Sequence, residues 1–151
     1  MINKKLIERK INRIEGYVSE IEPVLKFNTQ EIPKDVFKLR TLERNFQLIV
    51  DTVLDINTHI ISAEKLKAPE DMTETFTILG NAGILPGDFV KKISPVAGLR
   101  NMVVHDYEKI DVEKLINDIK KDIHQFMEYA VHIDNFMKLK QAEGYLNKNK
   151  K

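Results

Sequence analysis

Apolar residues recur along three long segments of the chain at alternating steps of three and four, which places them on one face of an α-helix. These segments cover residues 7–25, 39–60 and 112–137. The pattern therefore predicts three long amphipathic helices. The second is expected to run from about residue 34 to residue 65, or roughly 45 Å at 1.5 Å per residue. Pro23 is expected to bend the last turn of the first.

Shorter elements are predicted between the second and third long helices. Pro69 is expected to open a short helix whose end is marked by the glycines of residues 80–83, a pattern typical of a helix C-terminus. Pro86 starts another turn or two. Ser94 followed by proline predicts a capped helix start, and Asp111 is expected to cap the last long helix.

These elements define an all-α fold class, an up-and-down helical bundle with three long and two or three short helices. No segment alternates polar and apolar residues over enough length to predict a strand. A chain of 151 residues can bury such a core in one domain, which we assign to residues 1–140, with a basic tail at 141–151. Apolar surface left on the long helices also predicts a two-fold homodimer.

Composition removes several classes of protein. Cysteine is absent, which excludes a disulfide scaffold, a thiolate zinc site and a cysteine nucleophile. No apolar run reaches the roughly 18–20 residues of a membrane helix, and the basic N-terminus is no secretory signal. We therefore expect a cytoplasmic protein with no membrane partner. Neither a His-Glu-x-x-His motif nor a glycine-rich phosphate loop occurs, so no metal and no cofactor are expected.

Charge is concentrated at the two ends of the chain. The net charge is +1, yet residues 1–14 and 138–151 each carry +4, which leaves −7 on residues 15–137. Wholesale electrostatic coating of nucleic acid is not expected from this balance. Contact with nucleic acid would have to be local, at the basic ends or around single arginines, and simple solvation of the two ends is the alternative.

One short segment holds most of the residues that could do chemistry. Arg100, Asn101, His105 and Tyr107 lie within eight residues, on a predicted helix and its exit. A guanidinium binds phosphate bidentately, and an imidazole exchanges protons near neutrality. Asn101 lies only about 40° from His105 around the helix axis, whereas Arg100 and His105 are about 140° apart. Either the arginine reaches around the helix, or two chains share a site, or the pair is an ordinary surface feature.

This segment, Arg100-Asn101-x-x-Val104-His105-Asp106-Tyr107, resembles the Arg-x4-His-x-Tyr signature of the HepT-like toxins, a branch of the HEPN superfamily. The similarity extends to most of the chain outside the basic last dozen residues. It includes parts of the second long helix at 42–47 and 55–61, the turn at 80–86, and residues 107–111 before the last helix.

The resemblance implies the toxin of a prokaryotic toxin–antitoxin system, acting on RNA as a metal-independent endoribonuclease. HEPN ribonucleases pair the motif helices of two chains in one cleft. His105 is then the proton-transfer group, Arg100 stabilises the charged phosphate in the transition state, and Asn101 orients His105 or binds the phosphate. The expected product carries a 2′,3′-cyclic phosphate.

The resemblance also implies a protein partner. In HepT-type systems the antitoxin is a minimal nucleotidyltransferase, MntA, which transfers AMP from ATP to the motif tyrosine, here Tyr107. The added charge and bulk would keep RNA out of the site.

Polar residues of the second long helix repeat every four positions, at Glu43, Gln47, Asp51, Asp55 and His59. Such a stripe is typical of a solvated face. Because polar residues of this helix lie near the motif in the HepT-like family, Asp55 and His59 are candidates for supporting groups of the site.

Two other functions remain open at this stage. The chain could be a non-catalytic helical module that binds a nucleotide or a partner and is itself adenylylated, or a structural helical dimer without chemistry. The presence of Arg100, Asn101 and His105 together favours catalysis.

Overall fold

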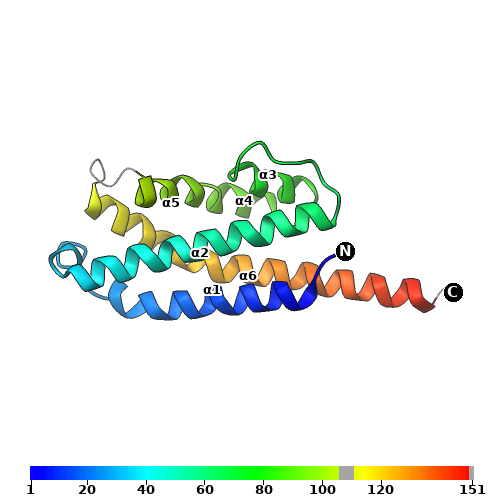
Figure 1. Cartoon of the computed structure of the whole chain (residues 1–151), viewed down its shortest axis with the longest axis horizontal. Helices are drawn as coiled ribbons and strands as arrows, with labels where there is room; N and C mark the ends of the chain where they lie inside the picture. Colours follow the sequence, from blue (N-terminus) through cyan, green and yellow to red (C-terminus); the bar gives the residue numbers. More distant parts are fainter. Residues whose placement is uncertain (106–110, 150–151) are drawn as a thin grey trace.

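Three long helices form the body of the protein (Figure 1). The computed structural model describes residues 1–105 and 111–149, with only the backbone for His105, so Tyr107 lies outside the described residues. The long helices are α1 (Lys4–Leu25), α2 (Val36–Ala63) and α6 (Val112–Asn149). The predicted bounds of the second helix agree with α2 to within two residues at each end.

Three short helices follow α2 along the chain, on the side away from α1 (Figure 1). The first and third of them pack against α2, and the second packs against the first and against α6. They are α3 (Glu74–Asn81), α4 (Gly87–Ile93) and α5 (Val96–His105), and a single 3-10 turn, η1 (Ile32–Lys34), precedes α2. The described residues contain no strand. The predicted all-α bundle is confirmed, with three long helices and three short ones where two or three were expected.

The apolar seams predicted from the sequence meet in one core with α2 at its centre. Ile7, Ile14 and Ile21 of α1 are buried, and every predicted seam residue of α2 is buried as well. Phe46 of α2 packs edge-on against Phe126 of α6, with ring centroids 6.1 Å apart. Helix α2 is covered by α1 on one side and by α5 on another. Side chains on the part of α2 between these two faces can therefore line a site at the surface.

Two helix ends follow their sequence signals. The carboxylate of Asp111 accepts a hydrogen bond from the Lys114 N–H at 3.1 Å, which caps α6 as predicted. At the end of α3, Gly83 has φ of +75°, and the N–H of Ile84 reaches back to the Leu79 carbonyl at 3.0 Å. This hydrogen bond is typical of the Schellman motif. The turn predicted at residues 80–83 is confirmed.

The helix start predicted at Pro69 is wrong, because α3 begins five residues later, at Glu74. The Asp71 carboxylate accepts from the N–H of Glu74 at 2.8 Å. The Glu74 carboxylate in turn accepts from the Glu70 N–H at 2.7 Å and pairs with Lys67 at 2.8 Å. These side-chain contacts hold residues 67–73 in a non-helical connection before α3.

Ser94 also departs from its expected role. It adopts αR geometry after α4, and its hydroxyl donates to the Val90 carbonyl at 2.5 Å. It therefore ends α4 and does not cap α5, although Pro95 does precede the first residue of α5.

The chain end continues the last helix. Residues 141–149 belong to α6, and all of them are exposed. This segment extends past the other helices (Figure 1). No helix in the described part of the chain is long and apolar enough to cross a membrane.

Candidate functional site

A pocket of about 600 Å³ lies where α2, α5 and the turn before α3 meet. Two of the predicted site residues on α5, Arg100 and Asn101, line it. The opposite side comes from α2 and from the turn at residues 71–73. The complete lining is Asp51, Leu54, Asp55, Asp71, Met72, Thr73, Ala97, Arg100 and Asn101.

The guanidinium of Arg100 is held in place at this pocket. Its Nε donates to Oδ1 of Asp51 at 2.7 Å, and its Nη1 donates to Oδ1 of Asn101 at 3.3 Å. The side chain is only 23% exposed. A guanidinium has five N–H groups, and those not used in these two bonds have no partner among the described residues. They can therefore bind an oxyanion at the pocket.

The backbone supports the expected relation between Asn101 and His105. Helix α5 is continuous through His105, its last residue. Residues four positions apart on a helix lie on the same face, so the Cα atoms of Asn101 and His105 share one side of α5. Arg100 lies on a different side of α5 from His105, as the angular estimate predicts.

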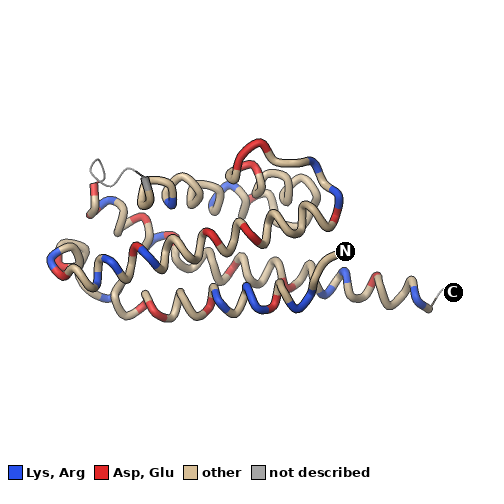
Figure 2. The backbone as a smooth tube through the Cα atoms, in the orientation of Figure 1, with Lys and Arg blue, Asp and Glu red and all other residues tan. Residues whose placement is uncertain are grey.

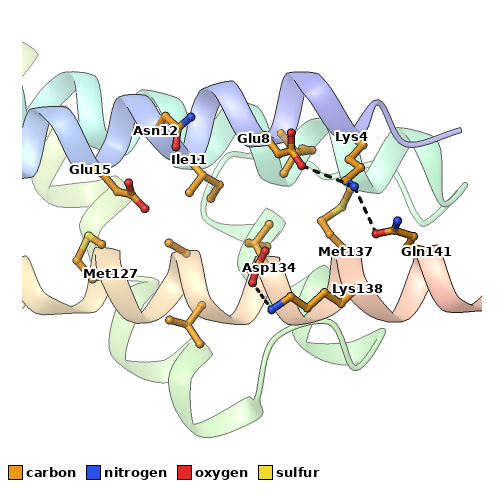
Figure 3. A pocket seen from close by; sticks show the side chains of 14 residues that line it. Lys4, Glu8, Ile11, Asn12, Glu15, Met127, Asp134, Met137, Lys138 and Gln141 are labelled. Carbon is orange, nitrogen blue, oxygen red and sulfur yellow. Dashed lines mark hydrogen bonds and ion pairs between the residues drawn. The ribbon is translucent and has the colours of Figure 1, made fainter.

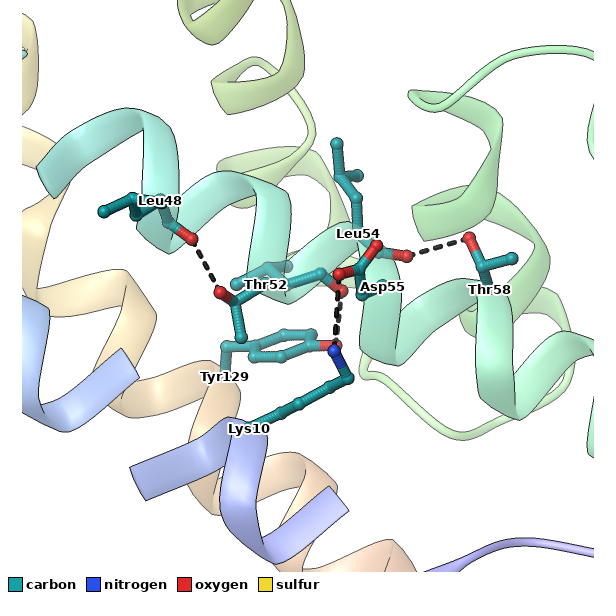
Figure 4. Close-up of polar contacts among 8 residues, drawn as sticks. Lys10, Leu48, Thr52, Leu54, Asp55, Thr58 and Tyr129 are labelled. Atoms are coloured by element: carbon teal, nitrogen blue, oxygen red, sulfur yellow. Dashed lines mark hydrogen bonds and ion pairs between the residues drawn. The ribbon is translucent and has the colours of Figure 1, made fainter. Parts of the chain in front are cut away.

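Asp55 and His59, the two supporting residues proposed from the sequence, have different surroundings. Asp55 lines the pocket, and its Oδ2 accepts from the Lys10 amino group of α1 at 3.3 Å (Figure 4). His59 does not line the pocket, and its Nε2 accepts from the Asn3 backbone N–H at 3.0 Å.

Sequence reasoning missed Asp51 as a site residue. It belongs to the same polar stripe, four positions before Asp55, and it makes the ion pair with Arg100. The four-residue spacing of the stripe was the signal that could have indicated Asp51. Spacing along one helix, however, does not say which of its members will face α5.

A buried hydrogen-bonded chain supports one wall of the pocket from inside the core. The Tyr129 hydroxyl of α6 bonds Oδ1 of Asn57 at 2.5 Å, and Nδ2 of Asn57 donates to Oγ1 of Thr75 at 3.0 Å. Thr75 then donates to the carbonyl of Met72 at 2.6 Å. Tyr129, Asn57 and Thr75 are fully buried, and burial raises the pKa of Tyr129 well above its ordinary value. This series of hydrogen bonds fixes the backbone at Met72, which lines the pocket.

A second hollow of similar volume, about 610 Å³, runs between α1 and α6 (Figure 3). Its walls are apolar side chains bordered by ion pairs, such as that of Lys138 with Asp134 at 3.0 Å. None of the residues predicted to act in catalysis lines it. Among the described residues, no three histidines or carboxylates converge as metal ligands would.

The bundle has the fold of HEPN toxins. The tri-AMPylated HEPN toxin of Shewanella oneidensis, solved in complex with its MNT antitoxin, superposes with a TM-score of 0.80 at 21% identity, over 88% of this chain and 99% of that one. The cytosolic protein YutE of Bacillus subtilis, of unknown function, also gives 0.80, at 15% identity over 92% and 93% of the two chains.

Comparison of sequences shows the family to which the chain belongs. Residues 7–133 match the family described as ribonuclease HepT-like, and the chain belongs to that family. It is 30% identical over 138 residues to the tRNA nuclease HepT of Aphanizomenon flos-aquae, covering 90% of this chain and 92% of the relative. Against the mRNA nuclease HepT of Shewanella oneidensis the identity is 23% over 124 residues, covering 82% and 92%. The resemblance noted from the motif is confirmed.

Proposed function

We propose that the protein is the toxin of a toxin–antitoxin pair and an endoribonuclease that cleaves RNA without a metal ion, in the cytoplasm. The observation that carries the proposal is the Arg100 guanidinium. It is fixed by Asp51 at the edge of a pocket, beside Asn101 and on the helix that ends with His105. Two relatives that carry the name HepT are nucleases of tRNA and of mRNA.

The reaction needs one proton acceptor and one proton donor. The imidazole of His105 accepts the proton of the ribose 2′-hydroxyl, whose oxygen attacks the adjacent phosphorus. The bond between phosphorus and the 5′-oxygen breaks, and a protonated imidazole donates a proton to that leaving oxygen. Arg100 stabilises the charge that develops on the phosphate oxygens. The products carry a 2′,3′-cyclic phosphate and a 5′-hydroxyl.

A homodimer supplies both imidazoles. His105 lies about 140° from Arg100 around α5, so one chain does not place the two groups on one face. Two copies of α5 related by a two-fold axis would bring a second arginine and a second histidine to the same phosphate. One His105 then acts as base and the other as acid.

The activity is controlled by a nucleotidyltransferase antitoxin in this proposal. The phenol oxygen of Tyr107 attacks the α-phosphorus of ATP, pyrophosphate leaves, and AMP remains on the tyrosine. Tyr107 follows His105 by two residues, so the added phosphate and adenine would compete with RNA for the site. The structural relative from Shewanella oneidensis is a tri-AMPylated toxin bound to its antitoxin.

The test is cleavage of a labelled RNA by the purified protein in the presence of EDTA. Wild type is expected to release fragments with a 2′,3′-cyclic phosphate, identified by mass spectrometry. Arg100→Ala and His105→Ala are each expected to lose activity by about a hundredfold or more. Arg44→Ala and His124→Ala are matched controls, since both side chains are exposed away from the pocket and should leave the rate unchanged.

Two results would contradict the proposal. Equal cleavage by the site variants and the controls would remove Arg100 and His105 from the chemistry. A wild-type protein that accepts AMP and binds RNA without cleaving it would favour the alternative function, a non-catalytic module that serves as an adenylylation substrate.

A further inference from the structure

The basic half of α1 lies beside the candidate active site. The first 14 residues carry +4 although the chain as a whole carries only +1, and Figure 2 shows these cations gathered on one half of α1. The ion pair between Lys10 of α1 and Asp55 of α2, at 3.3 Å, joins this half of α1 to a residue that lines the pocket. The edge of the pocket and the basic surface are therefore continuous.

Two arginines extend this surface outward from Lys10. By helical geometry Arg13 lies about 60° and Arg9 about 100° from Lys10, both in the same direction around α1. Both arginines are exposed, and neither forms an ion pair or a side-chain hydrogen bond with any described residue. They are four positions apart, so their Cα atoms are separated by about 6 Å along the helix axis.

The acidic side chains of this half of α1 border the groove with α6. Glu8 and Glu15 line the groove between α1 and α6, together with Asp134. Glu8 also borders Arg9, since the two line one shallow hollow of α1 with Lys5. Lys10 and Arg13 lie toward α2, where the only carboxylate that the structure shows in contact with them is the paired Asp55.

We propose that Lys10, Arg9 and Arg13 form a track for the sugar-phosphate backbone of the substrate RNA, leading away from the pocket. This rests on the proposed ribonuclease function. Lys10, only 17% exposed and paired with Asp55, fixes the start of the track, and the two arginines bind phosphates.

Charge complementarity selects RNA as the occupant. Of the carboxylates that line the pocket beside Arg100, Asp51 is paired with Arg100 and Asp55 with Lys10, whereas Asp71 forms no ion pair with any described residue and repels phosphate. A strand with its reacting phosphate at Arg100 is therefore favoured to leave over the cationic side of α1. The rest of the chain between the two ends is net negative, so local cations must supply the attraction.

The experiment compares two doubly substituted proteins. The test variant is Arg9→Gln with Arg13→Gln. The control is Lys91→Gln with Lys92→Gln, which removes the same charge from two exposed residues of α4. Fluorescence anisotropy with a 2′-O-methyl oligonucleotide, which the enzyme cannot cleave, measures affinity over a range of salt concentrations. Circular dichroism checks that each variant is folded.

The test variant is expected to bind about tenfold more weakly at low salt, with the control close to wild type. Its slope of log affinity against log salt should shrink by about 1.4, because each phosphate contact to a single strand contributes about 0.7. With cleavable RNA the KM should rise by a similar factor while kcat stays the same. Cleavage of a dinucleotide, which is too short to reach α1, should be unchanged.

Three outcomes of the RNA assays would overturn the track. These are an unaltered salt slope, an equal loss in the α4 control, or an equal loss on the dinucleotide, which would indicate a general defect. Failure of the nuclease assignment gives a different result, because wild type would then cleave neither substrate whatever the anisotropy data show. Loss of antitoxin binding with unchanged RNA affinity would instead make this face a protein interface and would reject the proposal.

Discussion

The Nε of Arg100 lies 2.7 Å from Oδ1 of Asp51, and this ion pair links α5 to the middle of α2. Both side chains are about two-thirds buried or more. An unpaired arginine has several rotatable bonds and loses conformational entropy each time it binds an anion. The carboxylate of Asp51 removes much of that freedom before substrate arrives. Asp51 is therefore a positioning residue for Arg100.

Replacing Asp51 by alanine should lower kcat for RNA cleavage by about ten- to a hundredfold, since small errors in the placement of a catalytic group are costly. The KM should not rise, because a negative charge near the phosphate is lost at the same time. Asp134→Ala, which breaks an ion pair in the distant α1–α6 groove, is the matched control. A kcat for Asp51→Ala equal to that of this control would show that Arg100 is oriented by other contacts.

Tyr129→Phe should destabilise the fold. The hydroxyl is fully buried and donates to Oδ1 of Asn57 at 2.5 Å, with the Val53 carbonyl further away at 3.2 Å, so its removal leaves the buried Oδ1 of Asn57 without this donor. Such a loss costs about 1–3 kcal/mol. Chemical denaturation would measure it, with Tyr145→Phe on the exposed end of α6 as the control. Equal unfolding midpoints for the two variants would contradict the role of the buried chain.

The same tyrosine predicts a pH dependence. Burial raises the pKa of Tyr129 above its ordinary value of 10.0, so the folded state holds this proton more tightly than the unfolded state. The stability from this difference is fully present below pH 10 and falls as the pH rises from there towards the folded pKa. Wild type should lose stability over this alkaline range more steeply than Tyr129→Phe, as measured by denaturation at each pH.

Local sequence signals predicted most of the fold. The apolar seams located the long helices because each seam depends only on residues three and four apart, and Asp111 and Gly83 act within a single turn. The prediction for Ser94 was wrong because a serine hydroxyl can either cap the following helix or bond a carbonyl of the preceding one. Here it donates to the Val90 carbonyl of α4. The late start of α3 depends on Asp71 and Glu74, whose carboxylates bond the backbone of a turn that no periodicity describes.

The lining of the candidate pocket was predicted only in part, for a physical reason. Arg100 and Asn101 are adjacent on one helix and were predicted together, and the structure places both at the pocket. Asp51 pairs with Arg100 across 49 positions of sequence, and the contact depends on how α2 and α5 are rotated against each other. Likewise, the bond between Asn57 and Tyr129 joins residues 72 positions apart. Such contacts are set by packing of the whole core.

The shared-site model predicts complementation between two inactive variants. Wild type should have a mass near 35 kDa by light scattering, twice the 17.5 kDa of one chain. Arg100→Ala and His105→Ala should each be inactive alone. After mixing and subunit exchange, mixed dimers hold one intact arginine and one intact histidine at the cleft. Because the second imidazole, the acid of the mechanism, is missing, activity should rise above that of either variant alone but stay well below that of wild type. A mass of one chain at micromolar concentration, or no recovery in a verified mixed dimer, would contradict the shared site.

Tyr107→Phe should separate the toxic activity from its control. The variant keeps the aromatic ring and the residues Arg100 and His105, so it should stay folded and toxic. It should lose rescue by an active nucleotidyltransferase antitoxin, because the acceptor oxygen is gone. With wild type, the antitoxin, ATP and Mg²⁺, peptide mass spectrometry should find one or more AMP units on the segment that contains Tyr107.

The structure sharpens the choice among the other possible acceptors. The Tyr129 hydroxyl is fully buried and hydrogen-bonded, and Tyr17 is half-buried on α1, whereas Tyr145 is 66% exposed on α6. Tyr145 is therefore the competitor to exclude, and Tyr145→Phe should accept AMP and be neutralised as wild type is. AMP found on Tyr145, or undiminished rescue of Tyr107→Phe, would overturn the assignment. A toxin that is neutralised without any added mass would show that the antitoxin inhibits by complex formation alone.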